Sequence, residues 1–290
     1  MMASTTSMTP GTRPLADFAG TIVLVGAGKM GSAMLEAWLA LGLPPASVVV
    51  LEPQPSRELG TLTSRGLQLN PAITAAREAS AIIVAVKPQV APEVVPTLRP
   101  YFGAGTVLVS IMAGRTLGFI EGALAQRAAL VRAMPNTPAL IGAGISGLYA
   151  MSGVDGEGRT RASSALEAVG GILWCEREED LDSITAVSGS GPAYVFYFIE
   201  ALEQAARDLG FEPTQARRLA LATFSGATRL AEQSDSEPAV LRAQVTSKGG
   251  TTERAIAALD NATVKAAIVD AVRAAAARAC ELGDFFGNER

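Results

Sequence analysis

The sequence predicts an α/β protein in which a doubly wound, mostly parallel sheet is followed by an all-helical domain. Short β-branched runs alternate with stretches of helical apolar spacing over the first part of the chain, and this alternation is typical of parallel sheets. After about Trp174 no such run recurs, and Ala-rich helical stretches dominate. We therefore divide the 290 residues into a disordered tail (1–18), a sheet domain (19–176) and a helical domain (177–290).

Each expected element has a local signal. Apolar spacing predicts a helix over 32–41, ended by Gly42 and Pro44, and a second helix is expected over 56–65. A proline at the first turn and a glycine at the end predict a helix over 193–209. Further helices are expected from Pro213, from Glu237 and from Thr252, with a very apolar stretch over 264–282. The expected strands are 21–25, 48–51, 67–69, 81–86, 106–110, 130–132 and 145–150.

Composition excludes several classes of function. A net charge of −4, with Lys and Arg unclustered, provides no basic field for nucleic acid or a membrane surface. The uncharged stretches 133–154 and 183–199 are interrupted by Pro and Gly, so neither is a membrane span. The tail has no apolar core typical of a signal peptide.

Histidine is absent and there are only two cysteines, so an imidazole base is excluded and no metal site is expected. Cys175 and Cys280, far apart in the sequence, fit a reducing cytoplasm, and we expect each to be a small buried apolar residue.

A glycine pattern directly follows the first expected strand. Gly26, Gly28 and Gly31 form GxGxxG with Ala27, Lys29 and Met30 between them, and a helix begins right after. This order suits a tight turn, a close approach of backbone to pyrophosphate, and a helix N-terminus that faces the anion. A purely structural glycine turn is the alternative. We therefore interpret 19–176 as a Rossmann-like dinucleotide-binding domain.

The choice of cofactor rests on the end of the second strand. Glu52 lies there, where a carboxylate would accept hydrogen bonds from ribose hydroxyls and repel a 2'-phosphate, which favours NAD. Arg57 follows closely and would bind that phosphate if Glu52 turned away. A solvated carboxylate without a ligand is a third interpretation. We expect NADPH, with NADH as the alternative.

Two further strand ends carry candidate cofactor residues. Ala85 and Val86 end the expected strand 81–86 and Lys87 and Pro88 follow it, at the edge where doubly wound sheets bind ligands. Lys87 is otherwise a surface lysine before a proline-started helix. In the rigid turn 134–138, Asn136 presents a polar group at the same edge.

A second glycine-rich turn lies in the helical domain. Residues 247–252 read SKGGTT, and a helix of Ala, Ile and Leu begins right after. Consecutive glycines expose backbone N–H groups at a helix N-terminus, which suits a small carboxylate, whereas an ordinary N-cap is the alternative. Because Glu253 in the same first turn would repel such a ligand, we expect it to point away.

Five ordered motifs resemble those of pyrroline-5-carboxylate reductases over nearly the whole chain after the tail. They are GAGKMG (26–31), AVKP (85–88), MPNTPA (134–139), VSGSGPAYVF (187–196) and VTSKGGTT (245–252). The family usually has proline where Lys248 stands, and this departure leaves the Gly-Gly-Thr-Thr core intact.

The resemblance implies NAD(P)H-dependent reduction of 1-pyrroline-5-carboxylate to L-proline. It places the substrate carboxylate at the amides of Gly249, Gly250 and Thr251, and the ring nitrogen at the catalytic hydroxyl of Thr252. It puts Asp235 where the family has an acidic residue near the substrate. The implied substrate-binding residues are Val245, Ser247, Gly249, Gly250, Thr251 and Thr252.

A helix nearly apolar all round, over 264–282, needs partners on every side, so we expect a second copy of the chain to cover it. A self-contained bundle is the alternative. The resemblance implies a homodimer whose sites combine two chains, and a ring of five dimers as a larger assembly.

Two other functions fit part of the pattern. A β-hydroxyacid dehydrogenase shares the glycine motif, but Gly189, Ser190 and Gly191 are not followed by the lysine its chemistry needs. A non-catalytic NAD(P)-sensing dimer would have no use for the SKGGTT turn.

Overall fold

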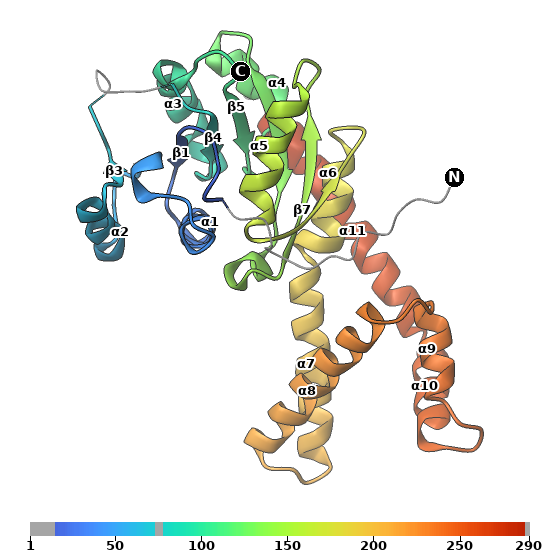
Figure 1. The fold of residues 1–290 in the computed structure, drawn as a ribbon. Helices are drawn as coiled ribbons and strands as arrows, with labels where there is room; N and C mark the ends of the chain where they lie inside the picture. Colours follow the sequence, from blue (N-terminus) through green and yellow to red (C-terminus); the bar gives the residue numbers. More distant parts are fainter. Residues whose placement is uncertain (1–14, 73–77, 288–290) are drawn as a thin grey trace. The chain divides into compact units, whose positions relative to one another are not determined.

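The computed structural model describes residues 15–72 and 78–287, which form two compact units (Figure 1). The first unit runs to Gly189 and takes in the chain again from Ala276, and the second is Ser190–Ala275. No described helix combines the length and the apolar character that crossing a membrane requires.

The first unit contains an eight-stranded sheet in the order β3-β2-β1-β4-β5-β6-β7-β8 among the described residues. All neighbouring strands are parallel except β6 and β7, which are antiparallel. This mostly parallel sheet confirms the predicted fold class. The strands are β1 (Ile22–Val25), β2 (Val48–Leu51), β3 (Gln68–Leu69), β4 (Ala81–Val84), β5 (Val107–Ser110), β6 (Ala129–Met134), β7 (Gly144–Ala150) and β8 (Gly170–Trp174).

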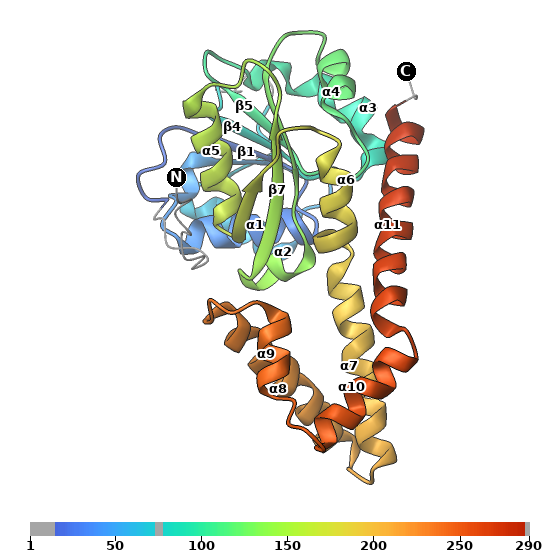
Figure 2. The same cartoon turned by 90° about the vertical axis from the view of Figure 1, so that its right-hand side faces the viewer.

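Helices cover both faces of the sheet (Figure 2). On one face α1 (Lys29–Ala40) packs beside α5 (Gly156–Glu167), and the buried Trp38 indole donates to the carbonyl of Ala165 at 2.8 Å. On the other face lie α3 (Ala91–Val94) and α4 (Leu117–Leu124). Because both faces are covered, the central strands are buried throughout, which explains their continuous apolar runs. Two further short α-helices belong to the unit, α2 (Arg57–Leu62) and α6 (Asp180–Ile184).

The structure corrects three expectations for this unit. Strand β8 was not predicted, because it opens with two glycines that weaken a strand signal. The expected tail reaches too far, since Leu15 is 2% exposed in the core and its N–H donates to the carbonyl of Leu41. Residues 1–14 lie outside the described part. The cysteines are not buried: Cys175 is half-buried and Cys280 is exposed.

The boundary between the units differs from the expected one after residue 176. The segment that follows belongs to the sheet domain because Glu178 accepts hydrogen bonds from the N–H of Leu117 and from Arg132, and because α6 packs on β7. The units divide after Gly189, at the end of a π-helical turn (Thr185–Gly189).

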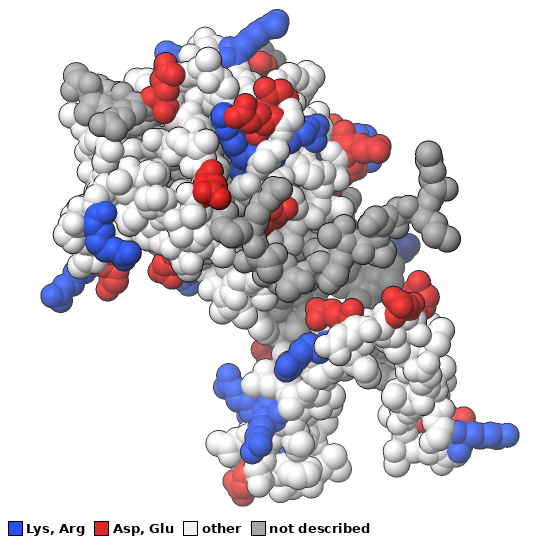
Figure 3. Space-filling view, in the orientation of Figure 1, with Lys and Arg blue, Asp and Glu red and all other residues white. Residues whose placement is uncertain are grey.

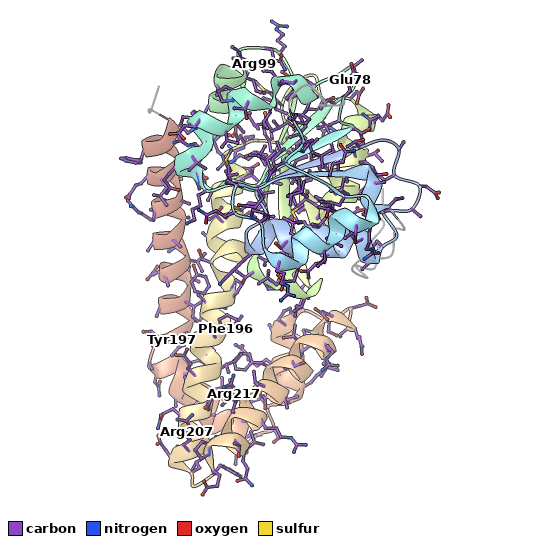
Figure 4. All side chains as sticks on the ribbon, turned by 90° about the vertical axis from the view of Figure 1, so that its left-hand side faces the viewer. Glu78, Arg99, Phe196, Tyr197, Arg207 and Arg217 are labelled. Carbon is purple, nitrogen blue, oxygen red and sulfur yellow. The ribbon has the colours of Figure 1, made fainter. Side chains whose placement is uncertain are left out.

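The second unit is built of amphipathic helices that leave much apolar surface exposed. No residue of α7 is buried, Tyr197 on α7 is 71% exposed, and Leu209 just after α7 is 81% exposed. Figure 4 marks Phe196 and Tyr197 on α7, together with Arg207 on α7 and Arg217 on α8. In the face drawn in Figure 3, most atoms of these helices belong to uncharged residues. The helices are α7 (Gly191–Asp208), α8 (Pro213–Glu232), α9 (Pro238–Gln244), α10 (Thr251–Asn261) and α11 (Val264–Gly287), which ends in the first unit.

Candidate active site

In the first unit, three of the predicted segments meet at the carboxyl edge of the sheet. The N–H of Gly26, after β1, donates to the carbonyl of Leu51 at 2.8 Å, and the N–H of Ala85, after β4, donates to Val25 at 2.8 Å. The turns that follow β1, β2 and β4 therefore lie side by side, as expected for neighbouring parallel strands.

The three glycines of the first turn have different surroundings. Gly26 has a φ of +92°, and a Cβ there would lie 2.9 Å from the carbonyl oxygen of Ala85. A Cβ on Gly31 would lie 2.2 Å from the carbonyl oxygen of Gly26, so close packing of helix and turn requires glycine. A Cβ on Gly28 would meet no atom of the described residues within 4 Å. The space in front of Gly28 is therefore open to a ligand.

The start of α1 is suited to an anion. Gly28 is its N-cap without a side-chain cap, and no acidic residue lies in its first turn. Within the described chain, the N–H groups of Lys29, Met30 and Gly31 have no hydrogen-bond partner. The hydroxyl of Ser32, which sequence reasoning missed, holds the turn by donating to the carbonyl of Ala27 at 2.8 Å. Unpartnered amides at a helix N-terminus fit the pyrophosphate of a dinucleotide.

Glu52 lies against this turn and does not turn away from it. Its Oε2 accepts the N–H of Ala27 at 2.8 Å, and its Oε1 accepts the N–H of Gln54 at 2.9 Å. Each carboxylate oxygen keeps a lone pair for a ribose hydroxyl. Arg57 is exposed in the first turn of α2, after the N-cap residue Ser56.

The AVKP segment lies beside the first glycine turn. A Cβ on Gly26 would also lie 2.9 Å from a methyl carbon of Val86, and Lys87 is exposed just before Pro88. Sequence reasoning missed Arg115, which is 1% exposed. Its Nε donates to the carbonyl of Pro88 at 3.0 Å, and its guanidinium lies 4.4 Å from the centre of the Phe119 ring. Arg115 thus ties the loop after β5 to the AVKP segment.

Asn136 is buried, and its side-chain amide makes hydrogen bonds to other parts of the protein. Its Oδ1 accepts the N–H of Ile145 at 2.9 Å, and its Nδ2 donates to the carbonyl of Ser188 at 3.0 Å. The side chain thereby joins the start of β7 to the segment before α7. Contact of Asn136 with a cofactor stays a prediction.

A nearly buried ion pair joins β6 to the segment just before α6. Arg132 on β6 and Glu178 have side-chain exposures of 7% and 21%, with 3.2 Å between Nη1 of Arg132 and Oε1 of Glu178. Oδ1 of Asp182 lies 3.7 Å from Nη2 of Arg132. Nothing in the spacing of these residues along the chain indicated this cluster.

The SKGGTT turn of the second unit leads directly into α10. Gly249 has a φ of +73°, and Gly250 is the N-cap without a side-chain cap hydrogen bond. Thr251 and Thr252 form the first turn. Within the described part of the chain, neither their N–H groups nor the Thr252 hydroxyl have a partner. The alternative of an ordinary serine or threonine N-cap is therefore not what the structure contains. Val245, just before the turn, and Ser247, its first residue, are exposed.

Glu253 corrects the expectation that it points away from this turn. Its Oε2 accepts the N–H of Gly249 at 2.7 Å, while the N–H of Gly250 donates to the carbonyl of Ser247 at 3.0 Å. Glu253 bends back because it lies near the helix start, where an acidic side chain is stabilised by unpaired amides. A carboxylate thus already occupies one of the three predicted amides.

Two family models match the chain. Residues 178–282 match the model described as pyrroline-5-carboxylate reductase dimerisation, and residues 21–114 match NADP oxidoreductase coenzyme F420-dependent.

Curated relatives are similar over nearly their whole length. A pyrroline-5-carboxylate reductase from Pseudomonas aeruginosa is 38% identical, with 92% of this chain and 98% of the relative covered. The enzyme of the same name from Vibrio alginolyticus is 34% identical, with 91% and 98% covered.

Two solved structures are similar to this chain over most of its length. A pyrroline-5-carboxylate reductase from Coxiella burnetii has a TM-score of 0.84 at 34% identity, covering 91% of this chain and 98% of that one. A pyrroline carboxylate reductase from Plasmodium falciparum, solved with NADP bound, has a TM-score of 0.79 at 27% identity, with 91% and 98% covered.

Proposed function

The chain belongs to the pyrroline-5-carboxylate reductase family, and on this premise we propose that it reduces 1-pyrroline-5-carboxylate to L-proline with NAD(P)H. The observation that carries the proposal is the start of α10. There a carboxylate, that of Glu253, accepts the N–H of Gly249, and the hydroxyl of Thr252, three residues further on, has no partner among the described residues. The substrate offers the same pair of groups, a carboxylate and a ring nitrogen.

The substrate carboxylate takes the position of the Glu253 carboxylate at the N–H of Gly249 and also accepts from the N–H of Thr251. Gly250 contributes by bringing the backbone close, because a Cβ there would lie 2.7 Å from the Ser247 hydroxyl. Val245 and Ser247 line the approach. Binding through backbone amides and the dipole of α10 requires no cationic side chain.

Thr252 acts on the ring nitrogen. Its hydroxyl donates a hydrogen bond to the nitrogen and passes on a proton from water, so that the imine carbon becomes electrophilic. When bound, the reduced nicotinamide supplies the hydride. The hydride adds to the carbon, the electron pair of the C=N double bond moves to nitrogen, and the proton held there completes the amine. No histidine base is needed.

The first unit binds the dinucleotide. The space that the described residues leave open at Gly28, and the N–H groups of Lys29, Met30 and Gly31, which have no partner among those residues, fit the pyrophosphate. Glu52 accepts from the adenosine ribose, and the segment from Ala85 to Pro88 lies along the nicotinamide half, with Asn136 at the same edge.

We infer a homodimer in which each site combines the first unit of one chain with the SKGGTT turn of the other. The exposed apolar side chains of α7 and the match to a dimerisation model support it, and a ring of five dimers is the larger assembly we expect. We propose a cytoplasmic location, and the small number and wide separation of the cysteines support it.

Complementation between two inactive variants tests the shared site. Gly31→Ala disables the phosphate turn and Thr252→Ala disables the substrate turn. When the two are refolded together, mixed dimers hold one intact site only if sites are shared between chains, and activity returns to about a quarter of wild type. No recovery, with mixed dimers detected by mass, would assign each site to one chain.

The reaction is tested by imine-dependent oxidation of NADH and of NADPH. We expect Thr252→Ala to lower kcat/KM for the imine about a hundredfold and to leave NADPH affinity nearly unchanged. Thr160→Ala, which removes an exposed helical threonine from α5, is the matched control and should retain full activity. Equal loss of nucleotide binding in Thr252→Ala would contradict the assigned role.

The same assay separates the two alternatives. A β-hydroxyacid dehydrogenase would oxidise 3-hydroxy acids and ignore the imine. A nucleotide-sensing dimer would bind NAD(P)H and turn over neither.

A further inference from the structure

Asn70 follows β3 in a conformation that side chains seldom adopt. Its φ is +45°, and its own N–H donates to the carbonyl of Val50 at 2.9 Å. Asparagine tolerates this left-handed region better than most residues, although glycine adopts it most freely. The presence of asparagine instead of glycine at this position therefore suggests that the side chain of Asn70 has a structural role.

The side-chain amide of Asn70 binds the peptide groups of Glu52 in both directions. The N–H of Glu52 donates to Oδ1 at 2.8 Å, and Nδ2 donates to the carbonyl of Glu52 at 2.8 Å. The backbone pairing of β2 with β3 stops at Val50 and Leu69. The amide of Asn70 thus extends the ladder by two residues, to the position where the chain leaves the sheet.

Glu52, the residue that Asn70 binds, carries a negative charge beside the glycine turn 26–31. Both oxygens of Glu52 are oriented by backbone N–H groups, those of Ala27 and Gln54. With its main chain fixed by Asn70 and its carboxylate fixed by these amides, Glu52 presents a negative charge at a set place beside the turn that suits a pyrophosphate. A 2'-phosphate brought there would be repelled, whereas a ribose hydroxyl would donate to the carboxylate.

We propose that Asn70 is a positioning residue that sets the preference between NADH and NADPH by fixing Glu52. The inference rests on the proposed function only in that the first unit binds a nicotinamide dinucleotide. It requires no contact between Asn70 and the cofactor.

The test compares the dissociation constants of NADH and NADPH, measured by fluorescence titration without the imine. Asn70→Gly removes the amide and suits the positive φ. We expect NADH to bind more weakly, and the ratio of the two constants to move about fivefold toward NADPH. Ala125→Gly, at another left-handed position in the same unit with φ +48°, is the matched control and should leave both constants unchanged.

A double-variant cycle distinguishes positioning from general support. In a Glu52→Gln background, Asn70→Gly should no longer change the ratio, because the charge it positions is gone. An unchanged ratio in the single variant, an equal loss for both nucleotides, or the same shift in the Glu52→Gln background would overturn the inference. If wild type binds neither nucleotide, the proposed function fails instead.

Discussion

The Glu253 carboxylate accepts a hydrogen bond from the N–H of Gly249, with 2.7 Å between Oε2 and the nitrogen, four residues back along the chain. The same amide is the one proposed for the substrate carboxylate. An internal carboxylate and the proposed ligand would therefore compete for one donor.

Replacing Glu253 with glutamine should strengthen substrate binding. The variant removes a negative charge that competes with the substrate carboxylate, so we expect KM for the imine to fall about threefold while the KM for NADPH stays constant. Glu157→Gln, in the first turn of α5, is the control for losing a helix-start carboxylate. A higher KM for the imine in Glu253→Gln would mean that Glu253 helps to hold the turn in its binding form.

Alanine substitutions at Gly28 and Gly31 should separate an effect on nucleotide binding from an effect on stability. Gly28→Ala meets no protein atom within 4 Å and has an ordinary φ of −67°, so we expect the melting temperature to be retained and nucleotide affinity to fall at least about tenfold. Gly31→Ala meets the carbonyl oxygen of Gly26 at 2.2 Å, so both should fall. Thermal melting and nucleotide titration of the two variants check this, and unaltered binding by Gly28→Ala would place the phosphates elsewhere.

Gly250→Ala should impair the substrate turn. The new Cβ would lie 2.7 Å from the Ser247 hydroxyl and 3.1 Å from the Ser247 carbonyl oxygen, so the turn must shift. We expect KM for the imine to rise about tenfold with nucleotide affinity intact. Gly122→Ala, in α4 with open space around it, is the control. Steady-state rates against imine concentration decide the outcome, and a normal KM would count against the amide site.

Neutralising Glu178 should destabilise the first unit. Glu178→Gln leaves the buried Arg132 guanidinium with only Asp182, at 3.7 Å, as a charged partner in the described chain. We expect the free energy of unfolding in urea to fall by about 2 kcal/mol. Combining it with Arg132→Met should recover part of that loss, since the stranded charge is removed as well. A double variant less stable than the sum of the single variants would refute this explanation.

The thiol of Cys175 should react only at high pH. Burial, and then the negative charge of Asp180, raises its pKa above the ordinary value. Folding therefore favours the protonated thiol, and this contribution to stability is present below the unfolded pKa and lost as pH rises through the folded one. In a Cys280→Ser variant, the iodoacetamide reaction should need a higher pH in the folded than in the urea-unfolded protein. Coincident pH profiles would show that the thiol is not shielded.

Sequence reasoning located the strands where β-branched residues run without interruption. Strand β2 is found at its predicted bounds because Val48–Leu51 is buried and flanked by turn residues. Strand β8 was missed because Gly170 and Gly171 carry no side chains to form a pattern. The glycine turn after β1 was found because its three glycines lie within six residues of one another in the sequence. One of the requirements is also local, since a Cβ on Gly31 would lie 2.2 Å from the carbonyl oxygen of Gly26.

What the sequence did not reveal depends on contacts between distant residues. Asn70, after β3, accepts a hydrogen bond from the N–H of Glu52, after β2. Arg115 donates to the carbonyl of Pro88 in another loop, and Arg132 donates to Glu178, which is 46 residues away. The direction of the Glu253 side chain was predicted wrongly because only its repulsion of a ligand carboxylate was considered. In the structure, attraction by unpaired amides at the helix start decides where the side chain points.

The return of the chain to the first unit at Ala276 limits how the protein can be dissected. The last turns of α11 supply Ala279, which is 9% exposed, so a fragment ending at Gly189 would lack part of its own packing. An isolated nucleotide-binding fragment would need residues 276–287 restored, as a fused or added peptide, before its affinity could be compared with that of the intact chain.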